Sequence, residues 1–252
     1  MKNILITGAS SGLGREIAVE YSSQNTNLYL IARNIQELEK AKKICEDRGA
    51  TVYIQVIDVK NKQEMKNYLE SLNVNFDIVF ANAGISSGTA ENFEEEDKIY
   101  NIFETNIMGV LNTITPIVQK MIKNRSGRIV LISSMASFRG MSTAPAYSAS
   151  KACVRFYGEA LNNYLKQYNV DVNVVCPGFI KTPLTDKNNF PMPFLMDTKT
   201  AVKKIVNSIN KNKKFIIFPK ILYYFITFLN ILPFGIDDYI FSKLSKHKFI
   251  KK

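Results

Sequence analysis

The sequence predicts an α/β protein built on a doubly wound parallel sheet of about seven strands with helices on both faces. Strand-like and helix-like segments alternate from the first residues onward, and the strand-like segments are short, nearly unbroken apolar runs. Such runs are typical of parallel strands buried on both faces, and each crossover between them should be right-handed. The length of 252 residues suits one domain of this kind.

The expected strands share aliphatic or aromatic cores and end at Gly, Asp, Asn or other turn-forming residues. The first is followed by Gly8, the third by Asp58 and the fourth by Asn82. The strands are expected at residues 3–7, 28–32, 52–57, 76–81, 128–132, 170–175 and 213–219, the last at an edge of the sheet.

The segments between the strands show helical spacing of apolar residues. The clearest one, IQELEKAKKICEDR, stops before Gly49, which is a C-terminal cap signal. The helices are expected at residues 12–24, 35–48, 61–72, 97–124, 146–168 and 198–211. Residues 183–197 hold three prolines and predict a loop. We therefore expect one domain over residues 1–219 and an apolar, then basic, C-terminal extension over 220–252.

The rare reactive residues exclude several classes of chemistry. The single histidine is His247, close to the C-terminal end, which argues against a histidine general base and against histidine-ligated metal sites. The three cysteines are far apart and form no CxxC motif, so neither a disulfide framework nor a cysteine zinc site is expected. The opening residues MKNILITGAS lack a secretory pattern, and we expect a cytoplasmic protein that needs no metal.

The net charge of +11 is concentrated at one end of the chain. Residues 1–198 carry 21 basic and 20 acidic residues, whereas residues 199–252 carry 12 basic and 2 acidic residues. A nucleic-acid binder more often spreads its basic residues over a folded face, so no nucleic acid is expected as a partner. A basic segment rich in Phe, Ile, Leu and Tyr fits an anionic membrane surface better, and a solubilising, lysine-rich end with no partner is the alternative.

A glycine-rich turn follows the first strand. Its sequence is Thr7-Gly8-Ala9-Ser10-Ser11-Gly12-Leu13-Gly14, with the glycine spacing G-x-x-x-G-x-G. In a Rossmann-type fold such a turn lets backbone N–H groups and a helix N-terminus approach a pyrophosphate. The turn therefore predicts a dinucleotide site.

The segment Tyr147-Ser148-Ala149-Ser150-Lys151 opens a predicted helix, so that Tyr147 and Lys151 share one face. A lysine ammonium beside a phenol stabilises the phenolate and lowers the pKa of the phenol, which suits a proton donor. Taken alone, the pair is more often an ordinary surface pair.

In combination, several motifs resemble the short-chain dehydrogenase/reductase family in its compact branch. They are the T-G-x-x-x-G-x-G turn, Asn82-Ala83-Gly84, Ser134 thirteen residues before Tyr147, the YxxxK pair, and Pro177-Gly178. The resemblance covers roughly residues 1–219 in the expected order. It implies an oxidoreductase that transfers a hydride between a nicotinamide cofactor and a carbonyl or secondary alcohol.

The resemblance also implies residue roles. The catalytic residues would be Asn106, Ser134, Tyr147 and Lys151. Asn106 would hold a proton-relay water, although a helix kink or a buried hydrogen-bonding residue explains it as well. The cofactor would contact Gly8, Ser10, Ser11, Gly12, Leu13, Gly14, Arg33, Asp58, Val59, Asn82, Ala83, Gly84, Tyr147, Lys151, Pro177, Gly178, Ile180 and Thr182.

The end of the second strand favours NADP(H) over NAD(H). An NAD site places an acidic residue there, whereas this chain reads Ile31-Ala32-Arg33-Asn34, and the first acidic residue is Glu37. Arg33 can pair with a 2′-phosphate, with Arg15 as a second candidate. We therefore expect reduction of an apolar ketone or aldehyde, with Phe190, Phe194, Leu195 and Met196 shaping the pocket.

The remaining expectations concern partners. The helices at 97–124 and 146–168 predict a homodimer, as the resemblance implies, with apolar faces at Ile107, Leu111, Ile114 and Val118 and at Tyr157, Leu161 and Tyr164. Residues 221–232 are too short to span a bilayer, and either lie on the inner face of a membrane or pack on the body or a dimer partner. Two other functions stay open: an NADP-binding redox sensor and a membrane-surface interaction protein.

Overall fold

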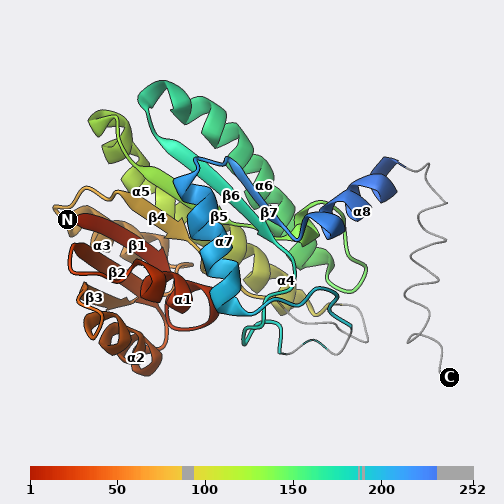
Figure 1. Cartoon of the computed structure of the whole chain (residues 1–252), viewed down its shortest axis with the longest axis horizontal. Coiled ribbons are helices and arrows are strands. Elements are labelled where there is room, and N and C mark those ends of the chain that lie inside the picture. Colours follow the sequence, from red (N-terminus) through yellow and green to blue (C-terminus); the bar gives the residue numbers. More distant parts are fainter. Residues whose placement is uncertain (87–93, 187, 189–190, 232–252) are drawn as a thin grey trace.

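The computed structural model describes residues 1–86, 94–186, 188 and 191–231. Seven parallel strands form one sheet in the order β3-β2-β1-β4-β5-β6-β7, which confirms the predicted fold class (Figure 1). The strands are β1 Lys2–Thr7, β2 Thr26–Ala32, β3 Thr51–Val56, β4 Ile78–Ala81, β5 Arg128–Ile132, β6 Asp171–Pro177 and β7 Phe215–Phe218.

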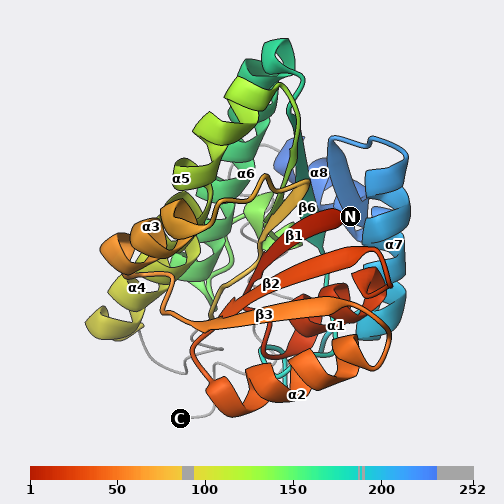
Figure 2. The same cartoon turned by 90° about the vertical axis from the view of Figure 1, so that its left-hand side faces the viewer.

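Helices cover both faces of the sheet (Figure 2). In Figure 2, α1, α2 and α7 lie on one side of the strands, and α3, α4 and α5 lie on the other. The helices are α1 Gly12–Tyr21, α2 Ile35–Glu46, α3 Lys62–Ser71, α4 Glu96–Phe103, α5 Gly109–Asn124, α6 Pro145–Leu165, α7 Thr198–Asn210 and α8 Lys220–Ile231.

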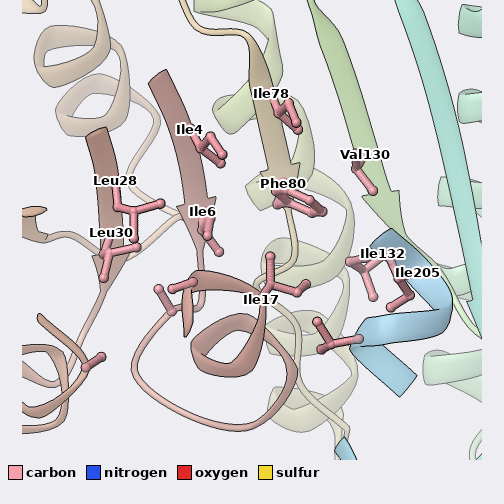
Figure 3. Close-up of a cluster of buried hydrophobic side chains, with 14 of the residues drawn as sticks. Ile4, Ile6, Ile17, Leu28, Leu30, Ile78, Phe80, Val130, Ile132 and Ile205 are labelled. Atoms are coloured by element: carbon pink, nitrogen blue, oxygen red, sulfur yellow. The ribbon is translucent and has the colours of Figure 1, made fainter. Parts of the chain in front are cut away.

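Each face of the sheet has its own hydrophobic core, because successive strand residues point to opposite sides. Ile4 and Ile6 of β1 pack with Ile17 of α1 and Ile205 of α7, as Figure 3 shows. Leu5, between them in sequence, belongs to the second core, which α3, α5 and α6 cover. Both cores are built from residues that are almost fully buried, so the sheet is rigid where its strands end.

The predicted helix at 97–124 is two helices joined by a π-helical turn. The turn spans Glu104–Met108, between α4 and α5, and contains Asn106. Inserted π turns often occur at functional sites, and no simple spacing rule marks them in a sequence. The other differences are at element ends: α1 stops at Tyr21, β2 starts at Thr26, and β6 runs on to Pro177.

The strand order places a topological switch point between β1 and β4. β1 pairs with β2 on one side and with β4 on the other, so the chain leaves β1 and β4 in opposite directions across the sheet. In an open α/β sheet, the crevice at the carboxyl ends of such strands is the usual ligand site. The glycine turn follows β1 at this point.

Packing of α6 on the sheet depends on Gly158. A Cβ at this position would lie 2.5 Å from Val174 Cγ2 and 2.8 Å from Leu131 Cδ1, whereas a Cβ at Gly140 would meet no atom within 4 Å. Overpacking costs about 1–3 kcal/mol, which exceeds the ~1 kcal/mol that Ala gains over Gly in a helix. We expect Gly158→Ala to lower the free energy of unfolding in urea titration and Gly140→Ala to leave it nearly unchanged. Equal stability of the two variants would contradict this packing.

Candidate active site

The predicted site residues converge on one cleft of about 700 Å³ at the carboxyl ends of the strands. Every predicted site residue except Gly14 and Asn106 lines it, and those two lie directly behind its wall. Further residues that the motifs did not indicate also line the cleft, among them Ile85, Thr105, Leu184 and Thr185. The volume suits a cofactor-sized ligand.

The glycine turn has room for backbone only. Gly8 has φ +67°, and a Cβ on it would lie 2.9 Å from Ala83 Cα. Gly12 has φ +52° and packs beside the side chain of Thr182, while a side chain at Gly14 would collide with the Gly8 carbonyl. The N-terminus of α1 begins at Gly12 and faces the cleft, so its backbone N–H groups are placed to bind an anion.

A hydrogen-bond network ties this turn to the end of β4. The backbone N–H groups of Asn82 and Ala83 donate to Thr7 Oγ1 at 3.1 and 3.2 Å. The Asn82 side chain donates back to the Thr7 and Gly8 carbonyls at 2.9 and 3.3 Å. The structural role of Thr7 was not predicted, because it depends on contacts with Asn82 and Ala83, which lie far away in the sequence.

Tyr147 and Lys151 lie on the first turns of α6, on one face, as the spacing predicts. The Lys151 Nζ lies 5.8 Å from the centre of the Tyr147 ring and donates to the Ile132 carbonyl at 2.9 Å. Ser134 lies close enough to the Tyr147 phenol to favour its ionised form. The Ser133 hydroxyl instead donates to the Lys151 carbonyl at 2.7 Å.

The pKa values of Tyr147 and Lys151 differ from the expectation that the lysine lowers the pKa of the phenol. Burial raises the pKa of Tyr147 above its usual value, and the Ser134 hydrogen bond opposes the shift only in part. Burial also lowers the pKa of Lys151 to about 8. The expected lowering of the Tyr147 pKa by Lys151 is therefore wrong for the protein alone, because the ammonium is held at the Ile132 carbonyl and desolvation outweighs it.

Asn106 is fully buried in the π-helical turn and makes three hydrogen bonds. Its side-chain amide donates to the Ile85 carbonyl at 2.9 Å and to Ser150 Oγ at 3.0 Å, and its carbonyl accepts from the Ile85 N–H at 2.8 Å. Ser150 in turn donates to the Tyr147 carbonyl at 2.8 Å. Asn106 thus connects the turn after β4 to α6, the helix that carries Tyr147. It does so through a buried side-chain amide that the π-helical turn positions.

Glu94 supports the helix that carries Tyr147, and no sequence motif indicated it. It is only 6% exposed, and its Oε2 accepts the Ala146 N–H at 2.9 Å, next to Tyr147. The residue before α6, Ala144, cannot cap a helix with its methyl side chain, so the Glu94 carboxylate supplies the negative charge that a helix N-terminus favours. Glu94 comes 52 residues before its partner, in a run of acidic residues that predicts a solvated surface.

Two arginines were candidates for the 2′-phosphate, and the structure separates them. Arg33 lines the cleft, with its Nη1 at 3.7 Å from Asp58 Oδ2 and 60% of its side chain exposed. Arg15 lies 3.5 Å from Glu37 and does not line the cleft. Thr105 Oγ1 is a buried atom in the cleft wall that lacks a hydrogen-bond partner among the described residues. The chain therefore offers a polar, cationic end to a bound nucleotide.

Three of the expected apolar loop residues, Phe194, Leu195 and Met196, do not line the cleft. Phe194 and Leu195 are exposed, and Met196 packs against the core beside Ile180. From this loop it is Leu184 and Thr185 that reach the cleft, because Thr185 Oγ1 hydrogen-bonds with the Ile180 carbonyl and the Thr182 N–H. Phe190 lies outside the described residues.

Two searches among the described residues gave negative results. No group of three or more His, Cys, Asp or Glu side chains is placed to hold a metal ion. Within the same part of the chain, every helix is too short or too polar to cross a bilayer.

Comparison with known proteins identifies the family. A family profile described as short chain dehydrogenase matches residues 2–192. An uncharacterized oxidoreductase of Myxococcus xanthus is 33% identical over 221 residues, which cover 86% of this chain and 87% of that protein. The chain belongs to the short-chain dehydrogenase/reductase family and is an oxidoreductase, as its motifs predict.

Solved structures of the same fold contain either nicotinamide cofactor. A short-chain dehydrogenase from Sphingobium yanoikuyae in complex with NADPH matches with a TM-score of 0.80 and 20% identity, over 100% of this chain and 97% of that one. A family member from Burkholderia phymatum in complex with NAD matches with a TM-score of 0.81 and 21% identity, over 90% and 92%. These neighbours share the fold and leave the choice of cofactor to the residues of this chain.

The buried ammonium of Lys151 predicts a pH effect on the stability of the cofactor-free protein. Since its pKa falls from 10.5 to about 8 on folding, the unfolded chain holds more protons between these pH values. The free energy of unfolding should therefore rise with pH in that window, by about 2–3 kcal/mol from this group. Lys151→Met lacks the titration, so wild type should gain stability relative to the variant between pH ~8 and ~10.5. Parallel pH profiles in urea unfolding would contradict the shift.

Proposed function

We propose that this protein is an NADP(H)-dependent carbonyl reductase that acts on an apolar ketone or aldehyde. The observation that carries the proposal is one cleft that holds Ser134, Tyr147 and Lys151 together with the glycine turn, and Arg33 at the end of β2. The first set fits carbonyl chemistry, and the turn and the arginine fit the phosphates of the cofactor. The glycine turn, which a Cβ would fill, is the structural reason to place a pyrophosphate there.

Proton transfer is the part of the reaction that belongs to the protein. When bound, the reduced nicotinamide supplies a hydride, two electrons and one proton, to the carbonyl carbon. Tyr147 gives its phenolic proton to the carbonyl oxygen, whose bond to carbon becomes single, so that an alcohol forms. Ser134 donates a hydrogen bond to the same oxygen as negative charge develops on it. The reverse sequence oxidises a secondary alcohol with the same groups.

Lys151 and Asn106 return Tyr147 to its starting state. Lys151 holds the nicotinamide ribose and stabilises the tyrosinate that remains after proton transfer. The proton that replaces the lost one comes from solvent through the buried polar groups behind Tyr147, where Asn106 and the Ile85 carbonyl lie. The adenosine part of the cofactor would contact Asp58, Val59, Asn82 and Ala83. The nicotinamide would contact Pro177, Gly178, Ile180 and Thr182.

Arg33 is the residue that we propose selects NADP(H). Its exposed guanidinium lines the cleft, and the only carboxylate within ion-pair distance of it among the described residues is that of Asp58 at 3.7 Å. A planar guanidinium pairs bidentately with a phosphate more strongly than with a hydroxyl.

A redox sensor that binds NADP(H) without turnover is the alternative on this fold. The intact set of Asn106, Ser134, Tyr147 and Lys151 argues against it, because cofactor binding alone does not need all four. A membrane-surface interaction protein is a further alternative. Steady-state NADPH oxidation with a panel of ketones separates the reductase from both.

We also propose that the protein is a cytoplasmic homodimer. Each chain has one catalytic domain over residues 1–219 and makes peripheral contact with a membrane through residues 220–252. Of the residues expected at the dimer face, Ile114 is buried in the core of its own chain, while Tyr157 and Tyr164 are exposed. Met108 of the π-helical turn and Phe156 of α6 are also exposed. These aromatic and sulfur side chains support pairing through α6 and the π-helical turn before α5.

If the protein is a homodimer, light scattering at micromolar concentration should give the mass of two chains. Replacing exposed apolar residues of α6 with charged ones, in a Phe156→Glu, Tyr164→Glu variant, should give a monomer, because like charges would be buried at the interface. A monomeric wild-type protein would overturn the dimer.

Tyr147→Phe should abolish turnover and leave NADPH affinity within a few-fold of wild type. The phenol acts in proton transfer, and loss of general acid catalysis costs about 10²- to 10⁴-fold in rate. Tyr157→Phe, on the same helix but outside the cleft, is the control and should keep its activity. Retention of more than a tenth of kcat by the Tyr147 variant would remove Tyr147 from the mechanism.

Arg33→Asp should shift cofactor preference from NADPH towards NADH. Loss of a charge-assisted hydrogen bond of about 1.5–3 kcal/mol corresponds to roughly 10- to 150-fold, and the new carboxylate also repels the 2′-phosphate. The measurement is the ratio of kcat/KM for the two cofactors, with Arg15→Ala as the control that should preserve it. A shift with Arg15→Ala and none with Arg33→Asp would make Arg15 the discriminating residue.

A further inference from the structure

The last described helix, α8, is apolar around its whole circumference. Its sequence is KILYYFITFLNI, with Lys220 as the only charged residue. One face packs on the body and includes Leu229, which is 2% exposed. The opposite face is between 49% and 77% exposed, and consists of Ile221, Tyr224, Phe225, Phe228 and Ile231. We call these five residues the outer face of α8, and Figure 1 shows the helix projecting from the body beyond β7.

The inner side of α8 touches two loops of the proposed catalytic cleft. Gly178, which lines the cleft, donates its N–H to the Phe218 carbonyl at 2.8 Å, and a Cβ on it would lie 3.6 Å from Leu222 Cδ2. Tyr223 packs edge-on against Phe138, with ring centres 5.0 Å apart.

Asn230 joins the far end of α8 to the segment that follows Ser134. Its amide donates to the Phe138 carbonyl at 2.8 Å and its oxygen accepts from Arg139 at 3.1 Å. Phe138 directly follows the short turn Met135–Ser137, in which Ser134 Oγ accepts the Ala136 N–H. The helix therefore borders the end of the cleft where Ser134 and Gly178 lie.

Charge indicates what covers the outer face. A helix that is apolar all round is normally buried in a protein core or in lipid. Residues 199–252 carry 12 basic and 2 acidic residues, against near neutrality in the rest of the chain, and five of the lysines follow α8 in sequence. A protein partner for the outer face would not require this excess, whereas an anionic bilayer surface attracts it. Twelve residues of helix measure about 18 Å, which suits a helix lying in the interface.

We propose that the outer face of α8 docks on an anionic lipid bilayer, and that a lipid-dissolved ketone or aldehyde passes along α8 into the cleft beside Gly178 and Ser134. The delivery step rests on the proposed reductase function; the docking step does not. Substrates of this class partition into the bilayer, so a cleft mouth held at the lipid surface meets them at high local concentration.

The test uses full-length protein and two variants of equal design. Phe225→Ser, Phe228→Ser removes two aromatic residues from the outer face. Ile44→Ser, Val56→Ser removes two exposed apolar residues from α2 and β3, at the opposite end of the molecule (Figure 1). Each protein is sedimented with phosphatidylcholine vesicles with and without phosphatidylserine. Each is also assayed with a short water-soluble ketone and with a long-chain ketone dissolved in the vesicles.

Wild type and the Ile44, Val56 variant should bind the phosphatidylserine vesicles, and binding should weaken but persist at high salt, because inserted apolar side chains are not screened. The Phe225, Phe228 variant should bind at least ~10-fold more weakly. It should keep its kcat/KM for the water-soluble ketone, and lose at least ~10-fold in activity on the vesicle-borne ketone, since docking and delivery share one surface.

Several results would overturn the proposal. Absence of vesicle binding at every salt concentration would show that the outer face is covered by a second copy or by the chain's own C-terminal residues. Unchanged turnover of the vesicle-borne ketone by the Phe225, Phe228 variant would reject delivery through α8. Inactivity of wild type on both ketones would instead reject the reductase function, and the sedimentation result would still decide docking.

Discussion

The cleft depends on the close packing of two backbone turns, the one after β1 and the one after β4. Gly8 lies so near Ala83 that a Cβ on Gly8 would not fit. The Thr7 hydroxyl accepts hydrogen bonds from the backbone N–H groups of Asn82 and Ala83. Because both strands are held in a rigid buried sheet, this contact fixes the glycine turn, the N-terminus of α1 and the floor of the cleft together. The site for an extended, charged ligand therefore depends on backbone geometry held in place by the Thr7 hydroxyl.

The proposed catalytic end is held by a second set of long-range contacts, all of which converge on the start of α6. Lys151 reaches the end of β5, Asn106 reaches Ser150, and Glu94 holds the first turn of the helix. Burial of an ammonium disfavours its charged form, and this desolvation lowers the pKa of Lys151. A bound nucleotide would supply hydroxyl groups as new partners for the ammonium, so cofactor binding and the charge of Lys151 are expected to be coupled.

The sequence alone determined the fold class, the glycine turn and the Tyr147–Lys151 pair. These features are local: the apolar period of a strand, the spacing of glycines and the i, i+4 geometry of a helix are all written in neighbouring residues. The sequence also located the excess positive charge, because composition needs no coordinates.

Only the tertiary structure decided the features that depend on distant partners. Glu94 lies among acidic residues and is nevertheless buried under α6, and Arg15 is drawn to Glu37 while Arg33 lines the cleft. Ile114 faces the sheet, Phe194 and Leu195 face solvent, and α8 packs one of its two apolar faces against the loops beside Ser134 and Gly178. In each case the local pattern allows a side chain to face either the core or the solvent. Which of the two occurs depends on contacts with residues tens of positions away, and short-range periodicity does not contain that information.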